Sequence, residues 1–389
     1  MNNTFDIMVI GGGLVGASAA VAMALKGFKV VMVDRHDPDL SVYDDLANWD
    51  QRIYAISPNN VAWLEEIGVW QGTDADRICT IQKMQIWGDS HSSRPLVFDA
   101  YENNTKDLGV ILESNQLLKA AWDRMSQLGV TILTGSECLD LEINDDVALL
   151  TLNDKRALEA KLVIAADGGQ SWVRKQCGIG TSLHVYDHKG VVANFETELP
   201  HHSIARQWFR EDGILAWLPL SGNRISMVWS TAKSDELLAD DLASLANKVA
   251  EAGHWQCGRL KAMTSPAVFS LVKQTADRLI GHRLVLVGDA AHQIHPMVGQ
   301  GVNLGFRDVI ELSRTLDQRK RFEEIGDDIV LRRYERERKS DMLGLGALTH
   351  GLYWLFSSDV TFIRRLGIKG MALLNKQNVI KRWLMEQAS

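Results

Sequence analysis

The chain has 389 residues, 46% of them hydrophobic and 23% charged, which is the composition of a globular protein with more than one core. The 42 Lys and Arg are outnumbered by 49 Asp and Glu, and the net charge of −7 argues against a general nucleic-acid binder. No run reaches the roughly 18 apolar residues of a membrane span. The opening residues lack the basic region of a signal peptide, so we expect a cytoplasmic protein. No CxxC pair occurs, so neither a disulfide framework nor a zinc site is predicted from Cys79, Cys138, Cys177 and Cys257.

The first residues have the pattern of a nucleotide-binding βαβ unit. A buried strand is predicted from Phe5 to Ile10, and a GxGxxG motif follows at 11–16. A small-residue helix from Ala17 to Lys26 leads to a second strand, Lys29 to Val33, which ends at Asp34. Because this acid lies 23 residues after the first motif glycine, it is expected near an adenosine ribose. The alternative is a glycine-rich turn with a helix packed tightly on it.

Residues from about 50 to 133 contain elements of the nucleotide-binding unit and, between them, strands expected to belong to a second domain. A loop at 50–57 carries Arg52 and precedes a predicted helix from Asn59 to Ile67. Alternating strands are predicted at 81–87 and 95–98, followed by a helix from Leu112 to Met125 and a strand from Val130 to Leu133.

A second motif follows the apolar strand predicted from Lys161 to Ala166. Its residues are Asp167-Gly168-Gly169-Gln170-Ser171-Trp172-Val173-Arg174. We expect Asp167 to cap a helix start and Arg174 to offer a guanidinium fork for phosphate or carboxylate. The alternative is a plain capping turn.

Residues 183–232 change to a meander of four predicted strands, 190–196, 204–209, 214–220 and 225–230, with a turn at Ser221-Gly222-Asn223. Three tryptophans lie on these strands. Each has two interpretations, either as core or as an apolar wall for a greasy aromatic substrate: Trp208, Trp217 and Trp229.

The third motif lies at 283–308. A short strand, Leu284 to Val287, runs into Gly288-Asp289, then a turn with Pro296, and then a glycine pair that opens a helix through Leu312. The first amides of a helix lack internal partners and carry the positive end of its dipole, so an anionic or polar ligand is expected here. The pair His292 and His295 has no third ligand, so no metal site is predicted.

These three motifs, in this order, resemble those of the aromatic-ring hydroxylases that bind FAD. The match rests on GDAAH at 288–292, Pro296, GQGVN at 299–303 and the DGxxSxxR pattern at 167–174. Over essentially its whole length the chain resembles the ubiquinone-biosynthesis hydroxylases. The stretch at 205–229 is similar to the family member that acts on a polyprenylphenol.

The resemblance implies an α/β fold like that of p-hydroxybenzoate hydroxylase. A Rossmann-like FAD-binding domain would comprise 1–78, 106–180 and 276–342. A mostly antiparallel β-sheet substrate domain would comprise 79–105 and 181–275, and 343–389 would form a helical C-terminal segment. One position departs from the family, which commonly has an arginine contacting FAD phosphate where this chain has Ser114.

The resemblance also implies the chemistry. NAD(P)H reduces the flavin, O2 adds to it, and the C4a-hydroperoxide passes an oxygen to the ring of a polyprenylated phenol or quinol. Cys138 would contact FAD through its backbone, and Pro296 would lie against the flavin ring. In the second interpretation of the tryptophans, they would form an apolar wall over the flavin. The implied cofactor-binding positions are Gly11, Gly13, Val15, Gly16, Asp34, Arg52, Cys138, Asp167, Gly288, Asp289, Pro296, Gly299, Gln300, Gly301, Val302 and Asn303.

Several alternatives stay open at this point. Within enzymes, the hydroxylated ring position or the phenol can differ, and NADH and NADPH are not distinguished. From a different class, the chain can be a non-catalytic FAD-binding assembly partner. The sequence does not separate a monomer from a homo-oligomer.

The C-terminal segment has two interpretations. Residues 343–374 interleave Leu, Met, Trp and Phe with Arg364, Arg365 and Lys369. Such a pattern fits helices packed on the main body. It also fits an amphipathic surface for the inner face of the membrane or for a partner of ubiquinone biosynthesis.

Overall fold

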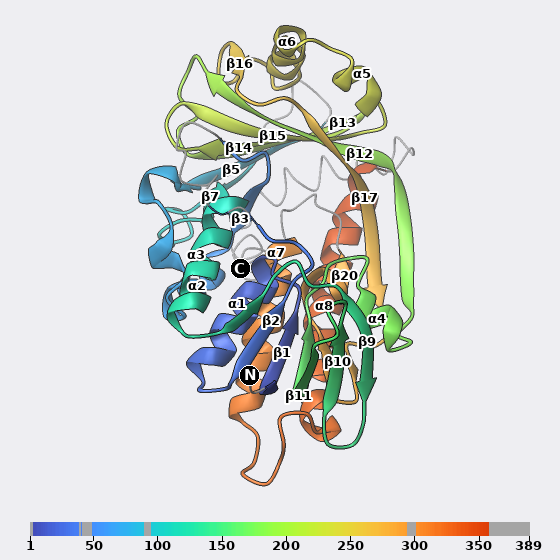
Figure 1. Ribbon diagram of the computed structural model, residues 1–389. Helices are drawn as coiled ribbons and strands as arrows, with labels where there is room; N and C mark the ends of the chain where they lie inside the picture. Colours follow the sequence, from blue (N-terminus) through green and yellow to red (C-terminus); the bar gives the residue numbers. More distant parts are fainter. Residues whose placement is uncertain (1–2, 39, 41–48, 89–94, 294–300, 358–389) are drawn as a thin grey trace.

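The computed structural model describes residues 3–38, 40, 49–88, 95–293 and 301–357, with side chains described through residue 342. Two large sheets form two layers, with helices around the first and on the outer side of the second (Figure 1). The predicted α/β fold is confirmed. Within the described residues, no helix has both the length and the hydropathy to span a bilayer.

The first sheet has a parallel centre, in the order β18-β19-β11-β1-β2-β8. An antiparallel pair, β9 and β10, extends it from β11. The central strands are almost entirely buried, as expected for a parallel sheet covered on both faces. The strands are β1 (Thr4–Ile10), β2 (Val30–Val33), β8 (Thr131–Leu133), β9 (Cys138–Ile143), β10 (Ala148–Leu152), β11 (Ala157–Ala165), β18 (Ile280–Gly281) and β19 (Leu284–Leu286).

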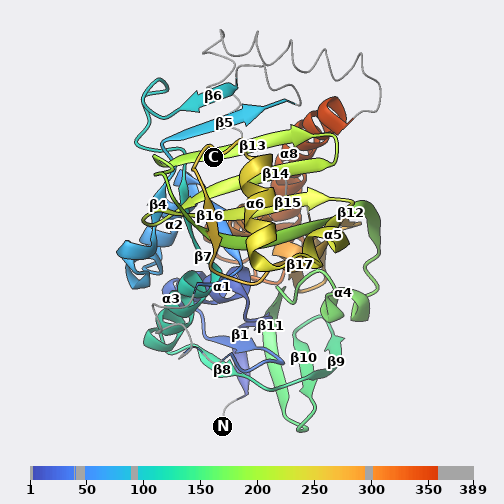
Figure 2. The ribbon, with the colours of Figure 1, turned by 90° about the horizontal axis from the view of Figure 1, so that it is seen from above.

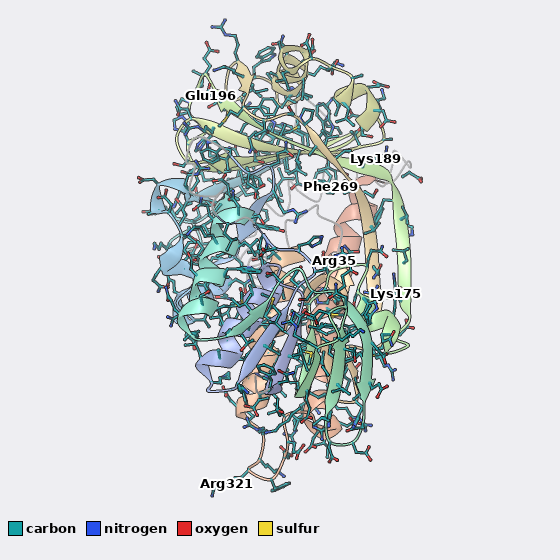
Figure 3. The ribbon with its side chains drawn as sticks, in the orientation of Figure 1. Arg35, Lys175, Lys189, Glu196, Phe269 and Arg321 are labelled. Carbon is teal, nitrogen blue, oxygen red and sulfur yellow. The ribbon has the colours of Figure 1, made fainter. Side chains whose placement is uncertain are left out.

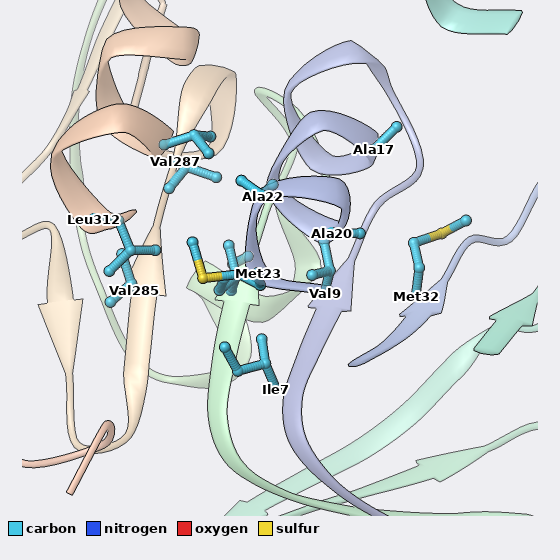
Figure 4. Packing of buried hydrophobic residues seen from close by; sticks show 14 of the residues in the cluster. Ile7, Val9, Ala17, Ala20, Ala22, Met23, Met32, Val285, Val287 and Leu312 are labelled. Carbon is cyan, nitrogen blue, oxygen red and sulfur yellow. The ribbon is translucent and has the colours of Figure 1, made fainter. Parts of the chain in front are cut away.

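Helices α1 (Leu14–Leu25), α3 (Ser114–Gln127), α7 (Gly301–Asp317) and α8 (Asp328–Ser357) surround this sheet. Small side chains on α1 let it approach the strands closely, and Met23 fills the remaining space beside Ile7 and Val285 (Figure 4). Because α1 follows the glycine motif directly, this packing fixes the position of the motif.

The second sheet is mostly antiparallel, in the order β20-β17-β12-β15-β14-β13-β5-β6, with β16 paired to β12. Helices α5 (Ser234–Leu238) and α6 (Leu242–Ala252) lie on its outer face, the face directed away from the first sheet (Figure 2). The strands are β5 (Lys83–Trp87), β6 (Leu96–Asp99), β12 (Thr181–Thr197), β13 (Ile204–Arg210), β14 (Gly213–Leu220), β15 (Arg224–Thr231), β16 (Leu260–Ala262), β17 (Ala267–Ala276) and β20 (His292–Gln293).

Strands β12 and β17 form the long connection between the two layers. The half of β12 from Lys189 to Glu196 pairs with β15 inside the second sheet, whereas its first half pairs with β17 alone (Figure 3). At the far end of β17, Gln274 pairs with Gln293 of β20, inside the third motif. The second sheet is therefore hydrogen-bonded to the segment that carries Asp289.

A small third sheet lies between the layers. It consists of β3 (Ile53–Ile56), β7 (Val110–Glu113) and β4 (Cys79–Thr80), followed by helix α2 (Pro58–Glu66) after β3. The helix predicted from Leu112 begins only at Ser114, because 110–113 pair with β3 instead. The remaining short elements are α4 (Trp172–Gln176) and the 3-10 turns η2 (Trp70–Gly72), η3 (Ala75–Arg77) and η4 (Gly288–Ala290).

Candidate functional site

The first glycine motif forms a tight turn with an uncapped helix start. A Cβ on Gly16 would lie 1.9 Å from the carbonyl oxygen of Gly11, and a Cβ on Gly11 would lie 2.4 Å from that of Ala166. Around Gly13, by contrast, a Cβ would meet no atom within 4 Å. No side chain caps α1, so the N–H groups of its first turn can donate hydrogen bonds to an anion such as a pyrophosphate.

Asp34 lies beside this turn, at the end of β2. Its Oδ2 accepts the Gly12 N–H at 2.5 Å, and its Oδ1 accepts the His36 N–H at 2.7 Å. The indole of Trp122 on α3 donates to the Gly12 carbonyl at 2.8 Å and fixes the turn from the other side. The carboxylate is thereby oriented, with lone pairs left for ribose hydroxyls.

Cys138 lies close to two of the predicted carboxylates. Burial raises the pKa of its thiol to about 12, and the nearby charges of Asp167 and Asp34 add to the shift. The thiol therefore stays protonated at neutral pH and offers no nucleophile. The structure thus brings together the first glycine motif, Asp34, Cys138 and Asp167.

The third motif packs directly on the first. A Cβ on Gly288 would lie 3.2 Å from Val15 Cγ1, and a Cβ on Gly305 would lie 2.5 Å from Val15 Cγ2. The turn that carries Asp289 therefore lies against the first turn of α1. Two motifs far apart in sequence form one continuous surface, as an extended dinucleotide requires.

A buried ionic cluster holds this turn in place. Asp308 of α7 accepts the Gly288 N–H at 2.8 Å, His292 Nε2 at 2.7 Å and Arg338 Nε of α8 at 2.7 Å. Burial alone would raise the pKa of Asp308, but His292, Arg338 and these hydrogen bonds outweigh it and hold the pKa below its ordinary value. Sequence reasoning missed this acid, although its spacing of four from Leu304 and from Leu312 places it on the buried face of α7.

Asp289 is accessible to solvent yet closely surrounded by protein. Burial raises the pKa of its carboxyl, and Gln293 Nε2 donates to it at 3.3 Å. Tyr54 lies near Arg52, Asp289 and Ser114; burial is the main cause that raises the pKa of its hydroxyl. At the position where the family commonly has an arginine, this chain therefore has Ser114 near Tyr54 and the Arg52 charge.

The loop before β3 is a strap that joins the layers, and we define the strap as Trp49 to Arg52. The Asp50 carbonyl accepts Asn194 Nδ2 from β12 at 2.8 Å, and its carboxylate accepts the Asn115 N–H at the start of α3 at 3.1 Å. Its own N–H donates to Glu113 at 2.6 Å. The backbone that presents Arg52 is therefore fixed from both layers.

Aromatic and ionic contacts support the same strap. Two guanidinium groups lie near the Trp49 ring, that of Arg77 at 3.9 Å and that of Arg224 at 5.2 Å from the ring centre. Arg77 also forms a buried bidentate pair with Glu113, at 2.6 and 2.7 Å. These pairs join residues far apart in the chain and have no local sequence signal.

The second motif agrees with its prediction in part. Asp167 contributes to the start of α4, but the N-cap residue is Ser171, which accepts the Arg174 N–H at 2.9 Å. Arg174 is buried and donates to the carbonyls of Ala290 and Gly169, each at 2.8 Å, so its fork is not available to a phosphate. Asp167 Oδ2 accepts the Val173 N–H at 3.1 Å, but its buried Oδ1 has no partner among the described residues, which fits a hydroxyl-bearing ligand.

The last predicted positions of the third motif, Gly301 to Asn303, lie at the start of α7. Gly301 is its first residue, and the side chain of Asn303 is engaged by the Ser57 N–H at 2.9 Å, by Asn60 Nδ2 at 2.8 Å and by the Ala55 carbonyl at 2.7 Å. Asn303 thus ties α7 to β3. Val302 is buried beside it. Outside the described residues lie His295, Pro296, Gly299 and Gln300.

Of the two interpretations of the tryptophans, the structure supports the core and contradicts the wall over the flavin. Trp208, Trp217 and Trp229 are buried in one cluster with Leu245 and Val249 of α6. The Trp217 ring also lies against Gly253 at the end of α6, where a Cβ would come within 2.1 Å. Because side chains alternate along a strand, these rings point to the outer face, away from the first sheet.

The inner face of the second sheet is directed toward the first sheet. It carries the residues that alternate along the strands with the outward-pointing tryptophans. Strand register places Val192, Val228, Ala216 and Gln207 in one row across β12, β15, β14 and β13. The first three are only half-buried although they occupy central strands, as is Leu218. Nearer β3 and β7, other inner side chains pack against Ile111 and Ile53. This face therefore offers small apolar side chains to a ligand between the layers.

These observations fit FAD better than a shorter nucleotide. The α1 start and Asp34 suit an ADP half, and Asp167 and Asp289 present carboxylates further along the same surface. Helix α7 begins beyond them with no acidic residue in its first turn. The ends of the site therefore match the two ends of one long ligand.

Comparisons with known proteins agree with this geometry. A family model described as FAD binding domain matches residues 4–342. The 3-demethoxyubiquinol 3-hydroxylase of Escherichia coli (strain K12) is 32% identical, over 100% of this chain and 99% of that protein. Ubiquinone hydroxylase UbiL of Rhodospirillum rubrum is 33% identical, over 98% of this chain and 89% of that protein. The crystal structure of p-nitrophenol 4-monooxygenase PnpA from Pseudomonas putida DLL-E4 has a TM-score of 0.79 at 18% identity, covering 99% of this chain and 98% of that chain, and shows the same fold.

Proposed function

Because the chain belongs to the family of FAD-dependent ubiquinone-biosynthesis hydroxylases, we propose that it hydroxylates the aromatic ring of a polyprenylated phenol or quinol. It is an FAD-dependent aromatic monooxygenase, which uses a reduced nicotinamide as reductant and O2 as co-substrate. The observation that supports the substrate class is the inner face of the second sheet, where half-buried Val192, Ala216, Leu218 and Val228 offer an apolar wall.

The residues that hold FAD follow from the site. The first turn of α1 and Asp34 would bind the ADP half, and Asp167 and Asp289 would accept hydrogen bonds from hydroxyls of the other half. When bound, FAD supplies the redox chemistry of hydride uptake and O2 activation. The protein supplies orientation and electrostatics.

The chain's own contribution is to exclude water and to place charge. With FAD bound, the apolar inner face would exclude water from the space beside the substrate ring. The start of α7, free of acidic residues in its first turn, favours negative charge in front of it. No described side chain needs to act as an acid or base in this account.

Turnover with a defined substrate tests the proposal. Purified FAD-loaded protein should oxidise NADPH or NADH faster when a 2-polyprenylphenol is added, and mass spectrometry should find a product one oxygen heavier. NMR of that product identifies the ring carbon. FAD-loaded protein that neither responds to phenols nor forms product would instead support an assembly partner without catalysis.

A further inference from the structure

Gln207 is an unusual residue on the inner face. Its neighbour Trp208 points to the outer face, so the alternation of β13 directs Gln207 toward the first sheet. The residue is only 7% exposed. Its cross-strand neighbours are Ala216 on one side and Ile86 on the other, and neither side chain can form a hydrogen bond.

No hydrogen bond of the Gln207 side-chain amide is found among the described residues, and its strand pairs with β14 and β5 on either side. The amide atoms are not among the fully buried polar atoms that lack a partner, so they remain within reach of a ligand. Of the four side chains in the row of Val192, Val228, Ala216 and Gln207, Gln207 alone is polar. A polar group placed among apolar ones in this way is typical of a residue that orients a bound ligand.

The charges on this wall narrow the class of ligand. The inner side chains of β13 and β14 are Ala205, Gln207, Phe209, Ile214, Ala216, Leu218 and Leu220, none of them charged. The two arginines of β13 point to the outer face, where Arg206 donates to the His201 carbonyl and Arg210 to that of Ala252. A carboxylate ligand would find no cation on these two strands. On the neighbouring β15, Arg224 lies on the inner face two rows away from Gln207, where it donates to the Ser221 carbonyl at 3.0 Å and contacts the Trp49 ring.

We propose that Gln207 is the polar anchor that recognises an un-ionised ring hydroxyl of the substrate, and that the wall around it selects neutral phenols over carboxylated ones. An amide both donates and accepts, as a phenol hydroxyl does, so one ligand group satisfies both atoms. This assignment rests on the proposed function, because it takes the inner face as the substrate wall.

Binding to the oxidised, FAD-loaded enzyme tests the assignment without turnover. The probes are a short-tailed 2-prenylphenol, its methyl ether and the corresponding carboxylated phenol, each titrated by the change in flavin absorbance. Gln207→Met keeps the size of the side chain and removes the amide. The matched control is Gln85→Met on the adjacent strand, since Gln85 pairs with Arg206 and faces the other side of the sheet.

We expect Gln207→Met to weaken phenol binding at least about tenfold, or about 1.4 kcal/mol. Binding of the ether should change much less, and Gln85→Met should bind both like the parent. The parent should bind the neutral phenol more tightly than the carboxylated one. Equal losses for phenol and ether, or an equal loss in Gln85→Met, would overturn the assignment.

Two further results separate this assignment from the proposed function. If phenol binding depends on Gln207 but no hydroxylated product forms, the proposed function is rejected and the role of Gln207 in phenol recognition stands. If hydroxylation is normal and Gln207→Met leaves the KM unchanged, the role of Gln207 is rejected and the proposed function stands. If Gln207→Met loses FAD, Gln207→Asn serves as the test variant instead. Its shorter amide should bind the phenol more weakly and bind the methyl ether as tightly as the parent does.

Discussion

The two faces of the second sheet differ although the same strands build both. On the outer face, Trp208, Trp217 and Trp229 are buried against α6. On the inner face, Ala216 and Val228 keep part of their surface exposed. The largest rings fill the outer face, whereas the central inner row consists of Val192, Val228 and Ala216. The difference teaches that the tryptophans mark the core of this sheet, whereas the face where we propose that substrate binds has smaller side chains at its centre.

Charge also separates the two faces of β13 and β14. Arg206 and Arg210 both belong to the outer face, where backbone carbonyls accept their hydrogen bonds. The inner side chains of β13 and β14 are neutral. A hydrophobic phenol is therefore better matched to the inner face than to the outer one.

Truncation of the outer face should have the largest effect on stability. Trp217→Ala should lower the free energy of unfolding by about 3–5 kcal/mol, because it leaves a cavity beside α6. Val228→Ala on the inner face should cost far less and act mainly on the KM for substrate. Chemical denaturation and steady-state kinetics of both variants make the comparison. If the two lose equal stability, the inner face is a packed core too.

The second-largest effect on stability is expected in the Asp308 cluster, because it holds the Gly288-Asp289 turn in place. Asp308→Asn should destabilise the fold by about 3 kcal/mol, since it leaves Arg338 without its buried partner. The folded-state pKa of Asp308 is lowered, so its stabilisation is present above the ordinary value of 3.8 and is lost as pH falls. Thermal unfolding between pH 3 and 7 should therefore show a flatter acid limb in the variant. An unchanged limb would place the acid sensitivity elsewhere.

Asp289→Ala should affect the cofactor more than the fold. Loss of a charge-assisted hydrogen bond costs about 1.5–3 kcal/mol, or more than tenfold in FAD affinity. The side chain is accessible to solvent, so the apoprotein should unfold near the parental temperature. Flavin fluorescence titration of the apoprotein measures the affinity. Parental FAD affinity in the variant would contradict the placement of the cofactor along the Asp289 turn.

The smallest effect is expected in the C-terminal segment, where we propose a contact with a membrane surface or partner. Replacing Arg364 and Arg365 with Glu should reduce binding to anionic liposomes, because each cation near such a surface contributes about 1 kcal/mol. FAD content should not change, and a short-tailed soluble phenol should still be turned over. Equal activity on long-tailed and short-tailed substrates would support helices that only complete the fold.

Local patterns in the sequence predicted much of the first layer. The glycine motif, Asp34 and the Gly288-Asp289 turn each lie next to a strand and a helix start, so short-range rules place them. The confirmed resemblance added the cofactor and the α/β fold. The contact between Val15 and Gly288 gives the geometry that joins these motifs.

The remaining features depend on contacts between distant residues. Period-two alternation shows that Trp208 and Gln207 face opposite ways, but not which face a helix covers. The apolar stripe of α6, with Leu245 and Val249, is the signal that could have assigned the tryptophans to the core. The sequence shows that Arg174 is a cation, but it does not show that the side chain is buried and bonded to backbone carbonyls. The pair of Asp308 and Arg338 likewise has no local signature.

Filling the inner face tests the central claim most directly. Ala216 lies in the middle of the inner row, so Ala216→Trp should block the substrate and leave the outer core intact. The account predicts a variant with parental FAD content and unfolding temperature, in which a 2-polyprenylphenol no longer accelerates NAD(P)H oxidation. Trp229→Phe on the outer face should keep that response. A parental response and KM in Ala216→Trp would contradict the claim that substrate binds against this face.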